Sequence, residues 1–189
     1  SYMPYFVSSV VVAGMAISFL DPNGLINNLI ALFGGTPREF ITDPDAFPAI
    51  YTVVTIWKDF GFASILYFST LSSIDPSLYE AATVDGANRL QKTWHVTLPG
   101  IQATIVTLFI LTVGRVMNAG FEQIFYMQNA AVKSVSDILD TYVYSITFQS
   151  TPNYGFSTAV GMFKAIINLT LLLTANLVVK KLNGSGMFN

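Results

Sequence analysis

The sequence predicts an all-α membrane protein, a polytopic helical bundle of about four spans with a polar segment between the second and third. Two observations carry this prediction. Hydrophobic residues make up 52% of the 189 residues and charged residues only 11%, whereas soluble domains carry about 25% charged residues. The chain also contains apolar stretches that approach the roughly 20 residues a helix needs to cross a bilayer.

The spans are expected at residues 2–20, 49–70, 99–117 and 155–179. The turn formers Asp21-Pro22-Asn23-Gly24 end the first span. A short apolar helix over residues 25–33 is expected at the membrane interface or against the bundle. The loop 34–48 is expected in solvent. Residues 118–136 are polar and broken, residues 137–148 are expected to form a helix of mixed character, and 149–154 a turn.

Two adjacent charged residues, Lys58 and Asp59, interrupt the second span. Neighbouring side chains on a helix point in different directions, so they are not an obvious ion pair. They are interpreted in two ways. The helix begins outside the bilayer and these charges snorkel or face a wet cavity, or they form a gate or a substrate contact.

The polar segment 71–98 has the pattern of two short helices. Asp75 can cap a helix that begins at Pro76, where the missing N–H costs nothing. Leu78, Ala81, Ala82 and Asp85 are spaced to share one face of that helix. Gly86 permits a turn into a second helical piece over 87–95. Leu98-Pro99 is expected to end that piece, because proline disfavours helix in the residue before it.

The same segment carries a spaced motif. Glu80-Ala81-Ala82, Gly86, Val96 and Leu98-Pro99 follow the pattern E-A-A-x3-G-x9-I-x-L-P, with Val96 for the isoleucine. The segment therefore resembles the EAA signature of ABC importer permeases, and Asp85 before Gly86 also fits that family. Because the full pattern lies between two apolar stretches, the resemblance is highly specific.

The resemblance extends over the whole chain. It is closest to the sugar-type permeases, in the branch often named for lipoprotein or polysaccharide transport. Three segments support that branch: Val11 to Asn27, Phe121-Glu122-Gln123-Ile124, and the closing Gly184-x-Gly186-Met187-Phe188. It implies the fold of type I ABC importer permeases, and import of a carbohydrate, with an oligosaccharide expected.

The resemblance also implies how the chain is coupled to ATP. Residues 76–87 would form a coupling helix that docks in a groove on an ATP-binding subunit, and 71–98 would be the coupling loop. Closure of the ATP-binding subunits would rock the spans between inward-open and outward-open states. The expected coupling residues are Glu80 as the polar contact, Ala81 and Ala82 as the close-packing face, Gly86 as the turn, and Asp85, Leu98 and Pro99.

The partners implied are a second permease subunit, two cytoplasmic ATP-binding subunits, an extracellular solute-binding protein and the lipid bilayer. No cofactor is expected on this chain, and ATP is expected on the partner subunits, because the sequence has no Walker Gly-rich loop with its Lys-Ser/Thr. It also has no cysteine and a single histidine, so a thiolate or His-based metal site is not expected. Neither H-E-x-x-H nor G-x-S-x-G occurs, and Cys-based catalysis is excluded, so an enzyme is not expected either. With a net charge of −2 and no basic patch, nucleic acid is not an expected partner.

Charge placement predicts the orientation. Basic residues next to spans favour the cytoplasmic side, and Arg89, Lys92, Lys180 and Lys181 fall on one side when the spans are counted. The coupling loop and the C-terminus are thus expected in the cytoplasm of a cell membrane protein. Such permeases generally have six spans. The chain is therefore expected to be one permease domain, 1–189, that lacks two N-terminal spans.

Polar groups within spans are expensive and usually face the bundle interior. On this ground the substrate path is predicted to include Asn118, Phe121, Glu122, Gln123, Tyr154, Lys164 and Asn168. The alternative for each is bundle packing or a place in an outer loop, and for Lys164 an ion pair with another subunit.

Three other functions remain open at this stage: an ABC permease for another solute, a secondary transporter or channel that needs no ATPase, and a purely structural membrane subunit. A polar two-helix loop is more than a simple carrier requires. Removal of Glu80 would leave assembly and transport untouched if the role were structural.

Overall fold

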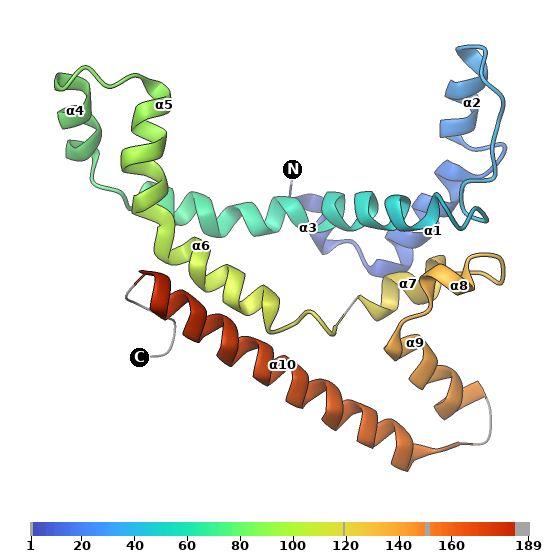
Figure 1. Ribbon diagram of the computed structural model, residues 1–189. Helices are drawn as coiled ribbons and strands as arrows, with labels where there is room; N and C mark the ends of the chain where they lie inside the picture. The colour runs from blue at the N-terminus through green and yellow to red at the C-terminus, as the bar shows by residue number, and fades with distance from the viewer. Residues whose placement is uncertain (1, 119, 150–151, 184–189) are drawn as a thin grey trace. The chain divides into compact units, whose positions relative to one another are not determined.

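The computed structural model describes residues 2–118, 120–149 and 152–183, with side chains through Lys181. The regular secondary structure of this part of the chain is helical (Figure 1). In chain order it comprises a 3-10 helix η1 (Met3–Phe6), α1 (Ser9–Leu20), α2 (Leu25–Leu32), α3 (Phe47–Ser72), α4 (Pro76–Val84), α5 (Arg89–Lys92), a π-helical turn η2 (Thr93–Thr97), α6 (Leu98–Val113), α7 (Phe121–Met127), α8 (Lys133–Ser136), α9 (Leu139–Tyr144), a second π-helical turn η3 (Ser145–Gln149) and α10 (Tyr154–Asn183). The closing Gly184-x-Gly186-Met187-Phe188 segment lies outside the described residues.

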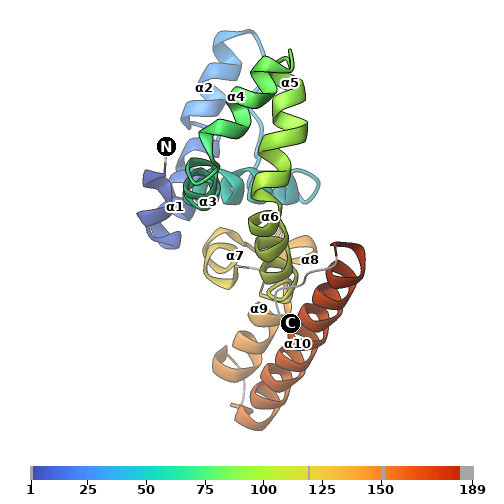
Figure 2. The same ribbon diagram turned by 90° about the vertical axis from the view of Figure 1, so that its left-hand side faces the viewer.

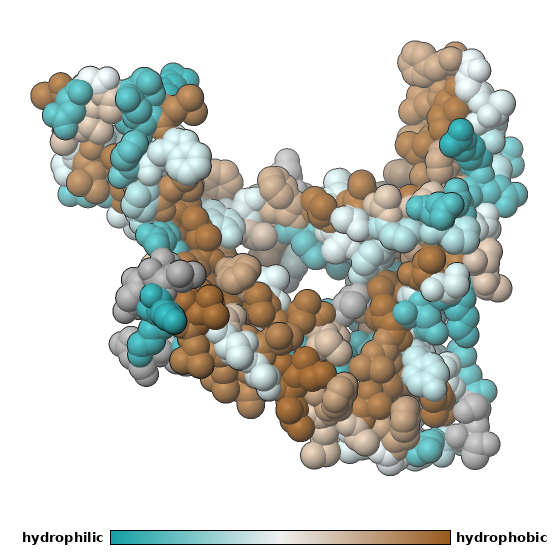
Figure 3. Space-filling model, in the orientation of Figure 1, coloured by the Kyte–Doolittle hydropathy of each residue, from teal (hydrophilic) through white to brown (hydrophobic). Residues whose placement is uncertain are grey.

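By length and composition, 4 helical stretches of the described chain can cross a membrane: Ser9–Leu32, Phe47–Ser72, Arg89–Val113 and Tyr154–Lys181. This confirms the predicted all-α class and the number of spans. Figure 3 shows the apolar character directly, since brown atoms cover α6 and α10 whereas teal atoms gather on α4 and α5. Polar residues therefore gather on the segment between α3 and α6.

The predicted start of the first span is wrong. The prediction began at residue 2, but the α-helix begins at Ser9 and follows the separate η1 turn. Two residues cause the break: Val7 is extended, and the hydroxyl of Ser8 accepts a hydrogen bond from the N–H of Val11 at 3.4 Å. Serine favours such caps over helix interiors. α1 has 12 residues, so it rises about 18 Å, and its apolar stretch continues through a turn into α2.

The predicted helix end at Leu98-Pro99 is also wrong. α5, η2 and α6 follow one another without a break, and Leu98 has helical φ and ψ of −62° and −45°. Proline within a helix removes one N–H and clashes with the carbonyl four residues earlier. The wider π-helical turn over Thr93–Thr97 lies directly before Pro99, where such a turn accommodates the ring.

Other boundaries differ less from the prediction. α3 and α10 extend a few residues beyond the expected 49–70 and 155–179. The stretch 118–136, predicted to be irregular, contains α7 and α8. α7 buries Ile124 and Met127, so it gains its stability from contacts with distant residues rather than from its local sequence. The helix predicted over 137–148 is α9 followed by the π-helical turn η3.

The chain forms two compact units. Unit 1 comprises Ser1–Gly61 and Asn118–Gly161. Its core consists of Ala13, Ala16, Phe47, Met127 and Val132, with Ile50, Tyr51 and Val54 packed against it. These residues bring α1, the start of α3 and α7 together.

Unit 2 comprises Phe62–Met117 and Met162–Asn189. The Thr70 and Thr104 hydroxyls, from α3 and α6, are 2.9 Å apart and hydrogen-bonded. The Asn168 amide oxygen on α10 accepts a hydrogen bond from the N–H of Met117 at 3.3 Å. Such polar contacts join helices in membranes, where the hydrophobic effect does not drive helices together.

Candidate functional site

The candidate site is the polar segment between α3 and α6, which folds as a hairpin of two helices. Its first helix, α4, begins as predicted. Asp75 is the N-cap, its carboxylate accepts a hydrogen bond from the N–H of Ser77 at 2.9 Å, and Pro76 is the first helical residue. The backbone hydrogen bond from Ser77, followed by that from its side chain, lowers the pKa of the exposed Asp75 carboxyl.

The turn after α4 depends on Gly86. Its φ is +77°, in the left-handed region that glycine enters without steric cost. The N–H of Gly86 bonds to the carbonyl of Thr83 at 3.0 Å, and the N–H of Ala87 bonds to that of Ala82 at 2.9 Å. These two bonds form a Schellman motif, which satisfies the last carbonyls of α4.

The second helix begins with a capping box. The Asn88 side chain accepts a hydrogen bond from the N–H of Gln91 at 3.0 Å, and the Gln91 side chain accepts one from the N–H of Asn88 at 2.8 Å. The chain direction is therefore set on both sides of Gly86 by local hydrogen bonds. The Asn88-x-x-Gln91 spacing is a sequence signal for the start of α5 that was not among the predictions.

Two side-chain contacts tie the helices of the hairpin together. Lys92 Nζ donates to the hydroxyl of Thr83 at 2.7 Å, near the turn. The hydroxyls of Tyr79 and Thr97 are 3.0 Å apart, at the end nearer the span. With a bond at each end, the helices cannot slide past each other without loss of these hydrogen bonds. The hairpin is thus a braced unit rather than a flexible linker.

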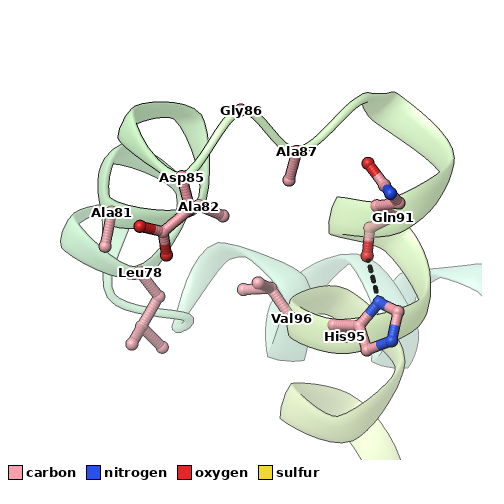
Figure 4. Close-up of a pocket in the computed structure, with 9 residues that line it drawn as sticks. All are labelled: Leu78, Ala81, Ala82, Asp85, Gly86, Ala87, Gln91, His95 and Val96. Carbon is pink, nitrogen blue, oxygen red and sulfur yellow. Dashed lines mark hydrogen bonds between the residues drawn. The ribbon is translucent and has the colours of Figure 1, made fainter.

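A hollow of about 450 Å³ lies between the two helices of the hairpin (Figure 4). It is lined by Leu78, Ala81, Ala82, Asp85, Gly86, Ala87, Gln91, His95 and Val96. Most of these side chains are small or apolar, and the Asp85 carboxylate is a hydrogen-bond acceptor. His95 Nδ1 lies 2.9 Å from the carbonyl oxygen of Gln91, which orients the imidazole at one side of the hollow.

The predicted shared face of α4 is confirmed, since all of its members line this hollow. The Glu80 side chain is exposed and lies outside the lining, so it is available on another face of α4. Leu98 and Pro99 begin α6 and also lie outside the lining. Gln91 and His95 were not among the predicted site residues, because only the fold of the hairpin brings them opposite α4.

The residues predicted for the substrate path are divided between the two units. In unit 1, Gln123 is buried, and its amide donates to the hydroxyl of Thr55 at 3.3 Å. Phe121 packs against Phe125 and Tyr144, with ring centroids 5.4 and 5.7 Å apart. These contacts give Gln123 and Phe121 a role in the packing of unit 1.

The remaining predicted path residues differ in exposure. Asn118, Glu122 and Tyr154 are exposed side chains of unit 1. Lys164 and Asn168 lie one turn apart on α10 within unit 2 and are partly buried, and Asn168 is engaged by the N–H of Met117. The path itself remains a prediction for all seven residues.

Lys58, one of the charges in the second span, has a partner within the bundle. Its ammonium group donates to the hydroxyl of Ser9 at 3.2 Å, which joins α3 to the first turn of α1. This contact gives Lys58 a partner within unit 1, and both interpretations of the Lys58-Asp59 pair stay predictions. Among the residues that the structure describes, no three His, Asp or Glu side chains are grouped so as to hold a metal ion.

The four apolar helical stretches and the braced polar hairpin between α3 and α6 define a polytopic helical membrane protein. The sequence matches the family described as "Binding-protein-dependent transport system inner membrane component" over residues 1–184. The chain belongs to this family.

Curated relatives include two proteins of Bacillus subtilis. The polygalacturonan/rhamnogalacturonan transport system permease protein YteP is 40% identical over 188 residues, which is 99% of this chain and 58% of YteP. Protein LplB is 41% identical over 188 residues, 99% of this chain and 59% of LplB. The chain therefore spans little more than half the length of these relatives.

Solved structures show the same fold. A chain of a bacterial alginate ABC transporter in complex with an alginate pentasaccharide-bound periplasmic protein has a TM-score of 0.90 and 37% identity, covering 98% of this chain and 65% of that one. A second structure, of a bacterial ABC transporter involved in the import of alginate, has a TM-score of 0.92 and 38% identity, covering 96% and 64%.

Proposed function

We propose that the protein is a membrane-spanning permease subunit of an ABC importer, and that it forms part of the path for a carbohydrate, an oligosaccharide in particular. Family membership supports the class of transporter. The relatives support the substrate class, because YteP is named for polygalacturonan and rhamnogalacturonan and the structural neighbours for alginate. ATP is bound and hydrolysed on separate subunits, and this chain carries no cofactor.

The braced hairpin is the observation that supports coupling to those subunits. A loop that transmits force must keep its shape under load, and the hairpin is braced by the Schellman turn at Gly86, the capping box at Asn88 and the Lys92–Thr83 and Tyr79–Thr97 bonds. α4 presents Glu80 as a polar contact outside the hollow, and Ala81 and Ala82 allow close approach to the backbone.

Continuity from the hairpin into the third span supplies the route for movement. Because α5, η2 and α6 form one uninterrupted helical rod from Arg89 to Val113, a push on the hairpin acts on the span itself. The Tyr79–Thr97 contact adds α4 to the same rod. ATP-driven closure of two partner subunits then rocks the spans between inward-open and outward-open states, a rigid-body switch.

The orientation follows from where the coupling partners lie. The hairpin and the end of α10, with Arg89, Lys92, Lys180 and Lys181, are assigned to the cytoplasmic side of the cell membrane. Residues 21–48 and 118–154 then face outward, toward a solute-binding protein. A second permease subunit completes the path.

Co-purification with the candidate ATP-binding subunit tests the proposal. In the full-length transporter, Glu80→Lys is expected to lose most of the associated ATPase while the permease remains folded in the membrane. Glu39→Lys is the matched control, because Glu39 is also exposed but lies in the loop between α2 and α3. Unchanged ATPase association and unchanged sugar uptake in Glu80→Lys would refute coupling through this hairpin.

A further inference from the structure

The helix α2, which follows the first apolar stretch, has its polar and apolar faces arranged in an unusual way. Its exposed face is a ridge of Leu25, Leu29, Leu32 and Phe33, with Leu32 77% and Phe33 87% exposed. At 100° per residue these positions fall on one side of the helix. Asn27, on the opposite side, is fully buried. An amphipathic helix on the surface of a soluble protein has the opposite arrangement, with its leucines buried and its amides exposed.

The buried amide has a clear structural role. Asn27 Nδ2 donates to the carbonyl of Asp21 at 2.9 Å and to that of Arg38 at 2.8 Å. Its Oδ1 accepts from the N–H of Arg38, also at 2.8 Å. One side chain thus joins the end of α1, α2 and the returning loop. The polar groups of Asn27 are used by these bonds, and the ridge faces away from them.

The direction of α2 fits a helix at a membrane surface. Figures 1 and 2 both show α2 running across the direction of the first half of α3, within unit 1. α3 has the length and composition to span a membrane, and a helix that crosses the direction of such a span lies along the membrane plane. Within the apolar stretch Ser9–Leu32, the α2 part then lies at the surface. Figure 3 shows brown atoms along one flank of α2 and teal atoms along the other, on the side of the returning loop.

Two further observations favour lipid over a protein partner as the occupant of this ridge. From Pro22 to Pro37 the chain has no charged residue, whereas protein interfaces have a polar rim around their apolar centre. The ridge also follows the apolar α1 after a single turn, Asp21 to Gly24, and the whole stretch Ser9–Leu32 has the hydropathy of a membrane segment. The nearest charges, Asp21 and Arg38, lie on the side that Asn27 binds.

We propose that α2 is an interfacial anchor: its ridge of Leu25, Leu29, Leu32 and Phe33 inserts at the boundary between lipid headgroups and acyl chains, and Asn27 holds the helix in that position. The anchor sets the depth of unit 1 in the bilayer. The inference rests on the membrane fold alone and does not depend on which solute is carried or on ATP coupling.

Spin labels at single cysteines test the position of α2, because the sequence contains no cysteine of its own. Labels would be placed at Leu32, at Phe33 and, as a control in the adjoining exposed loop, at Thr36, in the full transporter reconstituted in phosphatidylcholine–phosphatidylglycerol vesicles. Collisions with oxygen, which partitions into lipid, are expected to exceed those with a water-soluble nickel chelate several-fold at Leu32 and Phe33. The ratio is expected to reverse at Thr36.

Two results would overturn the proposal. If the nickel chelate reaches Leu32 and Phe33 as readily as Thr36, the ridge lies in water. If both reagents are excluded, a protein surface covers the ridge, and a change when the solute-binding protein is added would identify that surface. Quenching of Phe33→Trp by brominated lipid, in a Trp57→Phe and Trp94→Phe background, checks the result without a bulky label.

The role of Asn27 is tested separately. Asn27→Ala is expected to release α2, so that the label at Phe33 shows increased motion and a broader range of depths. Asn28→Ala is the matched control, since Asn28 is exposed and its side chain makes one bond, to the carbonyl of Asn23 at 3.1 Å. Equal label motion in both variants would refute the positioning role of Asn27.

Discussion

The hairpin between α3 and α6 and the corner between α1 and α2 use the same internal devices for different surroundings. Each is a compact reversal of the chain held by local hydrogen bonds. In the hairpin these are backbone bonds at Gly86 and the side-chain capping box at Asn88, and in the corner they are bonds of the Asn27 side chain. The hairpin presents small and acidic residues, whereas the corner presents leucine and phenylalanine. In both segments the internal hydrogen bonds fix the backbone conformation. The side chains that face outward then indicate whether the segment suits a protein partner or lipid.

The largest expected effect on function comes from Gly86→Val. The φ of +77° is strained for any residue with a Cβ, at about 1–2 kcal/mol, and most of all for a β-branched one. No atom lies within 4 Å of an added Cβ, so the cost is one of backbone conformation alone. We expect loss of the Schellman turn and of ATPase association, measured by co-purification.

Gly86→Asn is the control for that variant, because asparagine tolerates the left-handed region far better. Near-normal association in Gly86→Asn with loss in Gly86→Val would show that the turn conformation is required. Equal ATPase association in the two variants would show that the hairpin does not need this turn. The comparison between the hairpin and the α1–α2 corner would then be wrong.

The second effect is expected at the corner. Asn27→Ala removes the bonds to the Arg38 N–H and carbonyl in a fully buried position, and a buried group left unsatisfied costs about 1–3 kcal/mol. Thermal unfolding of the purified protein in detergent should show the loss of stability. Asn28→Ala should be near neutral, and an equal shift for both would mean that Asn27 does not hold the corner.

A smaller effect is expected within the spans of unit 2. The Thr70–Thr104 hydrogen bond joins α3 to α6, and such bonds in membrane proteins contribute about 0.6 kcal/mol on average. A double-mutant cycle with Thr70→Val and Thr104→Val should give a coupling energy of this order. Strict additivity of the two single variants would show that the bond contributes nothing to stability.

The smallest effect concerns pH and the cap of α4. The hydrogen bonds from Ser77 lower the pKa of Asp75 in the folded state, so the capping contribution is present above the ordinary aspartate pKa of about 4. It is lost as the pH falls through the lowered folded value. The protection factors for amide exchange in the first turn of α4, which correct for the intrinsic pH dependence of exchange, should therefore fall in acid. Asp75→Asn should weaken that pH dependence, and an unchanged profile would exclude Asp75 as its source.

Features that depend on neighbours in the chain could be predicted. The cap at Asp75-Pro76, the shared face of α4 and the turn at Gly86 involve residues within a few positions of one another, and all appear in the structure. The apolar stretches were predicted for the same reason, since length and composition alone decide whether a helix can cross a bilayer.

Features that depend on distant residues could not. α7 was missed because Met127 is buried by Ala13 and Phe47, from other parts of unit 1. The helix through Pro99 was missed because a π-helical turn replaces the expected break. The position of His95 opposite α4 follows from the folded hairpin, which no spacing rule contains.

Sequence alone therefore determined the all-α membrane class, the polar segment between the second and third spans, and the resemblance to importer permeases, since each depends on local composition or spacing. Tertiary structure alone decided that the hairpin is braced at both ends, that it runs without a break into α6, and that Asn27 turns inward while its leucine neighbours turn outward. The physical reason is that the braces and the burial of Asn27 are contacts between segments that meet only once the chain has folded. The helix passes Pro99 through a π-helical turn, which the proline in the sequence did not predict.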